Sequence, residues 1–527
     1  MKQICFTRSK GFFFIAITCL GIGLIVATAL YFFRHQQVDA EADVLYNRFG
    51  LQSCSGISLL PSYATSTPRA TILDRAGVVL AISQMRALLY AKTADIPAPM
   101  LAAQQISKIL GTDKRRLDAL FSSGSNICII KEGLSCQLAK KIAELNIPGI
   151  GIYYYFVRNY PYGDIVQDVV GDIGPSGQGI SGIEYFYNNR LSSVSGSHDS
   201  FSLSLDMDLQ AKAGSLLKWQ IGRLRADRGS LIFMDIKTGA ILAMVGCRRV
   251  GRSYEFTDSY LKAWLHPVVI FPCLNFLSTA GQKNFAKDNA VQNISCNCNV
   301  KRYKKAWFDT FNGQIAYWGP ASSNLFGFDD ENCGHFIGLL SALGFGQDTG
   351  IDLPGESQGF LAPVSAQTGM TLYLCRNIMA SPLQIVTAFS AILNGGRECV
   401  PHLKLDNKPE VHTRVVFRKE EVNHLVSMLS EGHGVSIASL YLTSPDSSFA
   451  SSHSPAQVVA LGFYPASHPR IVYMLALGGV TRDPRHIRGV LGRTWTIAEK
   501  ATTLPVIGIH VEGKLSYNRG VKHGTDF

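Results

Sequence analysis

The most constraining feature of this sequence is the stretch from Gly344 to Glu356, which reads Gly-Phe-Gly-Gln-Asp-Thr-Gly-Ile-Asp-Leu-Pro-Gly-Glu. Closely spaced glycines and a Pro-Gly pair favour tight turns, so this stretch predicts turns rather than one regular helix or strand. Upstream lies a Ser-x-Asn triplet, from Ser322 to Asn324. At a loop between helices, such a triplet presents a hydroxyl and an amide to a cleft. The triplet alone is equally typical of a helix N-cap and a turn.

Length and composition bound the possible classes of protein. The chain has 527 residues, which is enough for two or three domains. Its formal net charge of +11 suits nucleic acid, an anionic membrane or an acidic polymer as a partner. The basic residues are scattered and no nucleic-acid motif appears, so we expect a membrane-anchored protein and no nucleic acid. Cys296-x-Cys298 has no second pair to complete a zinc site, so we expect neither a metal nor a cofactor.

An uncharged apolar run extends from Phe12 to Phe33. It is long enough to cross a bilayer core of about 30 Å as a helix. Basic residues precede it and acidic residues follow it, so we expect the N-terminus in the cytoplasm and the rest outside. A cleaved signal peptide is the alternative, but the run is long for that and no small-x-small cleavage site follows.

The next segment, to about residue 200, predicts an extended module. Arg69–Ala81 reads as a strand, a tight turn at Ala76-Gly77 and a second strand. Pro99–Leu120 and Leu134–Leu145 carry apolar residues at three-to-four spacing, which predicts helices.

A second module begins near Leu203. Apolar residues from Leu209 to Leu224 mark one face of an amphipathic helix. Two strands and a closing hairpin are predicted after it, with a helix pair late in the module. These elements fall at Leu231–Asp235, Ile241–Val245, Gln457–Phe463 and Arg470–Leu477 for the strands, and around Ala380–Gln384 and Asn394–Gly396 for the helix pair.

Together these phrases resemble the class B penicillin-binding proteins, the monofunctional peptidoglycan D,D-transpeptidases. In that family the Gly344–Glu356 phrase follows a Ser-x-Asn motif at about this spacing. Arg69–Ala81 is similar to the family phrase Arg-Gly-x-Ile-x-Asp-Arg-x-Gly-x-x-Leu-Ala, with Ala70 in place of its glycine. The resemblance covers roughly Pro68 to Gly479.

The resemblance implies an α+β fold. We expect a transpeptidase-like domain with an antiparallel sheet between helix clusters, on an elongated N-terminal pedestal of the dimerisation type, with one N-terminal transmembrane helix. The expected boundaries are a cytoplasmic tail at 1–11, the transmembrane helix at 12–33, the pedestal at 34–200, the transpeptidase-like domain at 201–505 and a C-terminal tail at 506–527.

Arg158-Asn159-Tyr160-Pro161 and Gly182-Ile183-Glu184-Tyr185 with Arg190-Leu191 resemble other landmarks of the family's N-terminal pedestal. Three charged residues lie in the pedestal landmarks, namely Asp74, Arg75 and Glu184. We interpret them as structural rather than catalytic. They are expected to join Arg69–Ala81 to Arg158–Leu191 through ion pairs.

The family's chemistry needs a nucleophilic serine with a lysine one turn later, a Ser-x-Asn, and a Lys-Thr-Gly strand. Ser322 and Asn324 retain the Ser-x-Asn. In the better register for Ser-x-x-Lys, Pro267–Pro272, Val269 replaces the serine and Pro272 the lysine; in a second register, Pro272–Leu277, both are leucine. Leu440-Tyr441-Leu442 aligns with Lys-Thr-Gly. The resemblance therefore implies a scaffold without its reacting groups.

Two other nucleophiles were considered. Ser259-Tyr260-Leu261-Lys262 is a literal Ser-x-x-Lys, but it comes too early, and Pro267 and Pro272 would break the helix that must follow it. Cys273 lies in the right segment, yet a buried and inert thiol is the better interpretation. His266, His335 and His453 have no assignable partner.

We therefore expect a catalytically inactive transpeptidase homologue, a pseudoenzyme that acts as a membrane-anchored scaffold or regulator. One alternative is an active D,D-transpeptidase that uses Ser259 and Lys262 on D-Ala-D-Ala stem peptides. Another is a sensor that binds cell-wall fragments or β-lactams without turnover. The expected partners are membrane proteins of cell-wall synthesis or division, with stem peptides as further candidates. The expected location is the bacterial inner (plasma) membrane, single-pass, with the bulk of the chain periplasmic or extracytoplasmic.

Overall fold

A computed structural model describes residues 64–481, except 66, 123–126, 193–198, 271–272, 275–315, 319–336, 362–377, 406–412, 418, 431–436, 444–455 and 466–467. The predicted transmembrane helix, Phe12–Phe33, and both predicted tails lie outside the described residues. Among the helices within these ranges, none combines the length and the apolar character that a bilayer crossing requires.

The chain forms two compact units that do not follow the predicted boundary at residue 200. Unit 1 contains the chain up to Arg69, then Ser83–Asn159 and Ile173–Gln178; unit 2 contains Ala70–Ile82, Tyr160–Asp172 and everything from Gly179 onward. Part of the predicted pedestal therefore belongs to the larger unit. The reason is packing, because its apolar side chains share one buried core with the second module.

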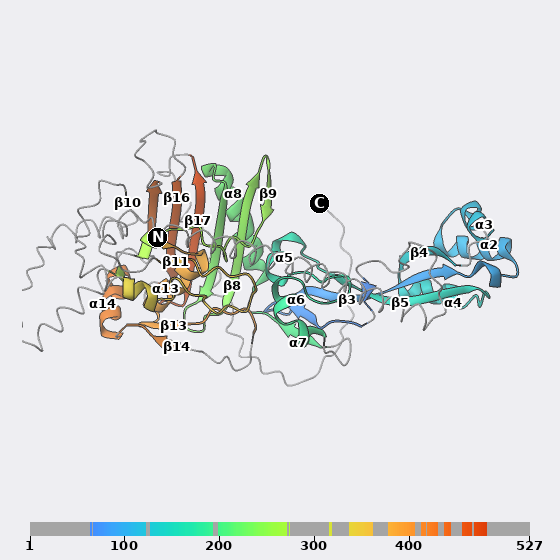
Figure 1. Cartoon of the computed structure of the whole chain (residues 1–527), viewed down its shortest axis with the longest axis horizontal. Coiled ribbons are helices and arrows are strands. Elements are labelled where there is room, and N and C mark those ends of the chain that lie inside the picture. The colour runs from blue at the N-terminus through green and yellow to red at the C-terminus, as the bar shows by residue number, and fades with distance from the viewer. Residues whose placement is uncertain are drawn as a thin grey trace, which may run out of the picture. The chain divides into compact units, whose positions relative to one another are not determined.

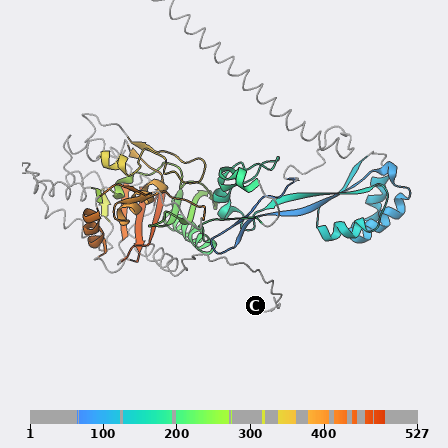
Figure 2. The ribbon, with the colours of Figure 1, turned by 90° about the horizontal axis from the view of Figure 1, so that it is seen from below.

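In its described residues, unit 1 contains paired strands and three short α-helices. β1 pairs antiparallel with β5, and β3 pairs antiparallel with β4. The blue and teal helices gather at one end of the long strands β3 and β5 (Figure 2). The elements are β1 (Ala64–Thr65), β3 (Val79–Ala91), η1 (Thr93–Asp95), α2 (Pro99–Leu110), α3 (Lys114–Phe121), β4 (Cys128–Leu134), α4 (Cys136–Ala143) and β5 (Ile150–Asn159).

The helix predicted over Pro99–Leu120 is two helices. Gly111 ends α2 with a φ of 64°, a left-handed conformation that glycine adopts without steric cost. Asp113 then caps α3, because its side chain accepts a hydrogen bond from the amide of Arg115. The helix predicted over Leu134–Leu145 is confirmed as α4, with Ser135 as its N-cap.

The predicted hairpin over Arg69–Ala81 is confirmed. β2 (Thr71–Leu73) pairs antiparallel with the start of β3, and Gly77 in the turn has a φ of 86°. β6 (Ser200–Ser202) pairs parallel with β2. The short helices α5 (Asp164–Val170), α6 (Gly182–Phe186) and α7 (Asn188–Ser192) belong to unit 2, as β2 and β6 do.

The expected packing of Arg69–Ala81 with Arg158–Leu191 is also confirmed. The Ala70 amide donates to the Leu191 carbonyl at 2.9 Å, and Arg158 Nη1 donates to the Arg69 carbonyl at 3.3 Å. The predicted role of Asp74 was wrong. Its carboxylate accepts hydrogen bonds from the amides of Ala76, Val78 and Met207 rather than from a basic side chain. A buried carboxylate in a tight turn is satisfied by the nearest N–H groups.

A seven-stranded sheet forms the centre of unit 2, in the order β10-β15-β16-β17-β7-β8-β9 (Figure 1). Neighbouring strands are antiparallel except β10 and β15, which are parallel. The strands are β7 (Arg228–Asp235), β8 (Ile241–Val250), β9 (Ser253–Phe256), β10 (Ala316–Trp318), β15 (Ile437–Thr443), β16 (Ala456–Tyr464) and β17 (Ile471–Val480). The predicted strands and closing hairpin are therefore confirmed.

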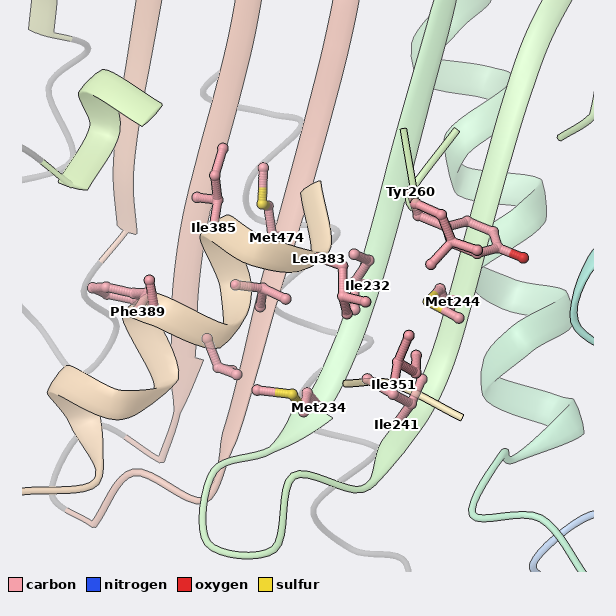
Figure 3. Packing of buried hydrophobic residues seen from close by; sticks show 14 of the residues in the cluster. Ile232, Met234, Ile241, Met244, Tyr260, Ile351, Leu383, Ile385, Phe389 and Met474 are labelled. Carbon is pink, nitrogen blue, oxygen red and sulfur yellow. The ribbon is translucent and has the colours of Figure 1, made fainter. Parts of the chain in front are cut away.

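Helices cover both faces of this sheet. In β7, Leu231 and Phe233 pack with α8 (Met207–Leu224), whereas Ile232 and Met234 pack on the opposite face with α13 (Pro382–Leu393). Figure 3 shows Ile232 of β7 beside Leu383 at the start of α13. Successive residues of a strand point to opposite faces, so one strand contributes to two cores. The expected antiparallel sheet between helix clusters is confirmed.

Smaller elements complete unit 2. They are η2 (Pro267–Ile270), β11 (Phe360–Leu361), β12 (Ile378–Met379), β13 (Arg397–Cys399), β14 (Thr413–Val415) and α14 (Lys419–Ser430). β11 pairs with β12, and β13 pairs with β14.

Candidate functional site

The two segments that the sequence analysis aligns with Ser-x-x-Lys and Lys-Thr-Gly are neighbours. η2, which carries Val269, lies against β15, β16 and α13. β15 carries Leu440-Tyr441-Leu442. A transpeptidase site of the expected kind requires its nucleophile segment beside its Lys-Thr-Gly strand, and these two segments have that relation. The candidate site is therefore the edge of the sheet at β15, with η2 beside it. Ser322 and Asn324 lie outside the described residues.

The segment before η2 crosses the sheet and is held at several points. Ser259 Oγ donates to the Gly229 carbonyl at 3.1 Å, over β7. Trp264 Nε1 donates to the Ser259 carbonyl at 2.8 Å. Gln457 Nε2, on β16, donates to the Trp264 carbonyl at 2.9 Å. The chain thus passes from β7 towards β16 before it reaches η2.

Ser259 lies far from the candidate site in the order of strands. It is 9% exposed and its hydroxyl lies 2.9 Å from Ser230 Oγ on β7, which β17 and β16 separate from β15. A Cβ added to Gly246 would come within 2.5 Å of Ser259 Oγ, so this hydroxyl fills space above a strand.

Lys262 has partners of its own. Its Nζ lies 2.9 Å from Asp258 Oδ2 and donates to the Gly355 carbonyl at 3.0 Å. Within the described part of the chain, no hydrogen bond joins Ser259 to Lys262. The geometry gives no serine–lysine pair in this stretch.

Cys273 is buried in the core beside the candidate site, with 2% of its surface exposed. Removal from water disfavours the thiolate and raises the pKa of Cys273 to about 12. The predicted burial of this thiol is therefore confirmed. His266 Nδ1 lies 3.0 Å from the Ile378 carbonyl, a contact that holds the ring against β12. His335 and His453 lie outside the described residues.

The Gly344–Glu356 phrase serves the fold through Asp352. Asp352 Oδ1 accepts from the Leu403 amide at 2.6 Å, and Oδ2 accepts from the Lys404 amide at 2.8 Å and from Tyr187 Oη at 2.9 Å. Asp352 is 7% exposed, so its charge is balanced by these donors. Sequence reasoning missed Tyr187 and residues 403–404, because their contacts are separated widely along the chain.

Asp352 thus acts as a clamp, meaning a side chain whose hydrogen bonds hold distant segments together. A second clamp lies at the beginning of α13. Ser381 and Gln384 form a reciprocal capping box. Gln384 Nε2 also donates to the carbonyls of Gln347 at 2.7 Å and Gln358 at 2.8 Å. The phrase is thereby attached to the helix that packs on the sheet. The Ser-x-x-Gln pattern was available in the sequence as a capping signal, although its further partners were not.

The outer edge of β15 is occupied. β10 pairs with it in parallel register, with Ala316 opposite Leu440, Tyr317 opposite Tyr441 and Trp318 opposite Leu442. The other edge of β15 pairs antiparallel with β16 over Ile437–Thr443. The residues aligned with Lys-Thr-Gly therefore have strands on both sides.

Comparisons with known proteins agree with this architecture. Residues 64–202 match the Penicillin-binding Protein dimerisation domain, and residues 331–434 match the Penicillin binding protein transpeptidase domain. Stage V sporulation protein D of Bacillus subtilis is 24% identical over 64% of this chain and 59% of that protein. The peptidoglycan D,D-transpeptidase FtsI homolog of Mesostigma viride is 30% identical over 39% of this chain and 38% of that protein.

Solved structures show the same fold. Penicillin Binding Protein 2X from Streptococcus thermophilus superimposes with a TM-score of 0.62 at 16% identity, over 84% of this chain and 80% of that one. The fold is thus a penicillin-binding transpeptidase domain joined to a dimerisation domain. The chain therefore has the two-domain composition of the class B penicillin-binding proteins. Its matches span 59% of the first curated relative's length and 38% of the Mesostigma protein's length.

Proposed function

We propose that this chain is a catalytically inactive class B penicillin-binding protein that acts as a scaffold or regulator in cell-wall synthesis or division. One observation carries the proposal. β15, at the site edge, has Leu440-Tyr441-Leu442 where the family has Lys-Thr-Gly, and η2 beside it has Val269 where the family has its nucleophile. Valine cannot attack a carbonyl, and leucine cannot attract a peptide carboxylate.

The geometry disfavours the active alternative. A nucleophile at Ser259 would act over β7, while the substrate-binding strand of the family corresponds to β15. Acyl transfer needs a base within hydrogen-bond reach of the nucleophile. Ser259 instead contacts Ser230 and Gly229, and Lys262 contacts Asp258 and Gly355.

The proposal includes a membrane anchor at Phe12–Phe33, with the N-terminus in the cytoplasm. The uncharged run and its flanking charges support this orientation. The partners would be membrane proteins of the cell-wall machinery, bound through the anchor and the dimerisation-type domain. A mature N-terminus mapped at residue 34 or beyond would show a cleaved signal peptide instead.

Acylation by penicillin tests the loss of catalysis. The purified protein is incubated with a fluorescent penicillin and examined by gel fluorescence and intact-mass spectrometry, beside an active class B protein as positive control. We expect no adduct, because the serine, the lysine and the carboxylate-binding lysine are all replaced. An adduct at Ser259 that Lys262→Ala abolishes would establish a rearranged active site. An adduct at Cys273 would establish a substituted nucleophile.

A genetic experiment tests the scaffold role. Deletion of the gene for this protein should disturb cell shape or division. Expression of the Ser259→Ala variant in the deletion strain should restore normal shape and division fully. Failure of Ser259→Ala to restore function, while the protein accumulates normally, would argue for chemistry at that serine.

A further inference from the structure

The outer edge of β15 is the place where a peptide would add to this sheet. An edge strand presents a row of N–H and C=O groups that readily pair with another extended segment. Peptide recognition by strand addition uses this row for affinity. In the family resemblance, the substrate lies against the strand that corresponds to β15. An unpaired outer edge at Leu440–Leu442 would therefore be a ready peptide-binding surface.

In this chain the edge is already paired. Ala316–Trp318 lies beside Leu440–Leu442 in parallel register, and Tyr317 is opposite Tyr441 at the centre of the substituted triad. The backbone of β10 thus takes the outward-facing groups of β15 that an incoming peptide needs. Two strands cannot pair with the same edge at once.

We propose that β10 is a self-ligand: the chain's own Ala316–Trp318 segment closes the peptide-binding edge of β15 and excludes stem peptides from it. This inference rests on the proposed function, since it takes β15 as the counterpart of the substrate-binding strand. It goes further by assigning an occupant to the outer edge of β15. Under both proposals, this edge is covered by β10 and the site beside it has no reacting groups.

The composition of the two segments suits this pairing. Neither Ala316–Trp318 nor Leu440–Leu442 contains a charged residue, so the pairing brings no unpaired charge to the sheet edge. A lysine in place of Leu440 would instead favour water or an anionic ligand there. The presence of three uncharged residues where the family has Lys-Thr-Gly is therefore consistent with the occupation of the edge.

Disulfide trapping tests the pairing and its direction. Parallel register predicts that Trp318→Cys with Leu442→Cys cross-links on mild oxidation, because directly paired Cα atoms lie within the range of about 4.4–6.8 Å that disulfides need. The matched control is Trp318→Cys with Leu440→Cys. An offset of two residues at a strand spacing of about 4.8 Å separates those Cα atoms by about 8 Å, which is too far.

The cross-linked peptide is identified by mass mapping, since the chain has twelve native cysteines. A cross-link in the 318–442 pair at several times the yield of the 318–440 pair supports the inference. The reverse order of yields, or no cross-link in either pair of a folded protein, overturns it.

Hydrogen exchange tests what the pairing covers. Proline disrupts strand pairing, so Tyr317→Pro should displace β10 and speed exchange of the β15 amides that donate to β10 carbonyls. Tyr317→Phe, which keeps the backbone donor, should leave their exchange unchanged. Equal exchange in the wild type and Tyr317→Pro would show that β10 does not close this edge.

The two proposals fail separately. A penicillin adduct on the wild-type protein contradicts the proposed loss of catalysis, whatever the cross-linking result. A failed 318–442 cross-link with no adduct contradicts only the closure by β10.

Discussion

Single buried acids hold distant segments of this chain together. Asp352 and Asp74 each accept hydrogen bonds from backbone amides, and Asp352 also accepts one from a tyrosine. Their role is to fix the paths of distant segments. Such residues remain necessary when chemistry is lost, because a buried donor left without its acceptor costs about 1–3 kcal/mol.

Removal of the Asp352 charge should destabilise unit 2. In Asp352→Asn, an amide NH2 replaces an oxygen that accepts from backbone N–H or Tyr187 Oη, so donors face each other. We expect a loss of about 1–3 kcal/mol in the free energy of unfolding, measured by urea denaturation.

Asp348→Asn is the matched control, since Asp348 is exposed and belongs to the same phrase. It should change the free energy by less than about 0.5 kcal/mol. Similar losses in both variants would contradict a clamping role for Asp352.

Asp168 predicts a pH dependence of stability. Its partial burial, with the nearby charges of Asp258 and Asp164, raises its pKa from 3.8 to about 6. Because the folded protein holds this proton more tightly than the unfolded chain, stability falls as pH rises from about 4 to 6. Asp168→Asn should raise the melting temperature at pH 7.5, and this gain should disappear near pH 4.

The exposed Asp95→Asn variant is the control, and it should shift the melting temperature little at either pH. A gain from Asp168→Asn that is equal at pH 4 and pH 7.5 would exclude the ionised carboxylate as its cause.

At the scale of elements, local signals were predictable and long-range pairing was not. The hairpin at Arg69–Ala81 follows from its central turn, and the strands β7, β8, β16 and β17 follow from short continuous apolar runs between turns. The break at Gly111–Asp113 was missed because the apolar period continues across it. β10 has only three residues, and its pairing with β15 has no local signal.

The start of α13 offers a test of element positioning. Gln384 accepts a hydrogen bond from the Ser381 amide and donates to the carbonyls of Gln347 and Gln358. Ser381→Ala removes only a cap contact and should cost about 0.5–2 kcal/mol. Gln384→Glu keeps the acceptor but loses both donors and places a carboxylate in a buried site, so it should cost more in urea denaturation. The opposite order would refute a clamp at Gln384.

At the scale of the whole molecule, the units defined by contacts differ from those defined by family landmarks. Sequence similarity divides the chain near residue 200, yet segments before that point contribute Ile72, Leu80, Val166 and Ile183 to the core of unit 2. A sequence alone could not show this, because a core is defined by packing between distant segments. Family resemblance predicted the sheet and its helices, but it could not place β10 or the clamp partners of Asp352.

Two shortened chains should therefore behave differently. A chain that begins at residue 201 loses apolar residues buried in the core of unit 2, and it should aggregate or melt without cooperativity. A chain in which a short Gly-Ser linker replaces residues 84–157 should keep a cooperative thermal transition by circular dichroism. Its cut ends are close, because Arg158 Nη1 donates to Ser83 Oγ at 3.3 Å. Cooperative melting of the 201 chain near the wild-type temperature would contradict this division.

The pairing of β10 with β15 also bears on solubility. β15 reads Ile-Ala-Ser-Leu-Tyr-Leu-Thr, without charge or proline. Segments of this composition at an open sheet edge are templates for aggregation between molecules. A family member with Lys-Thr-Gly at this position has a charge that discourages such stacking. In this chain β10 pairs with Leu440–Leu442 and covers that part of the edge, so we expect a variant that displaces β10 to self-associate more readily.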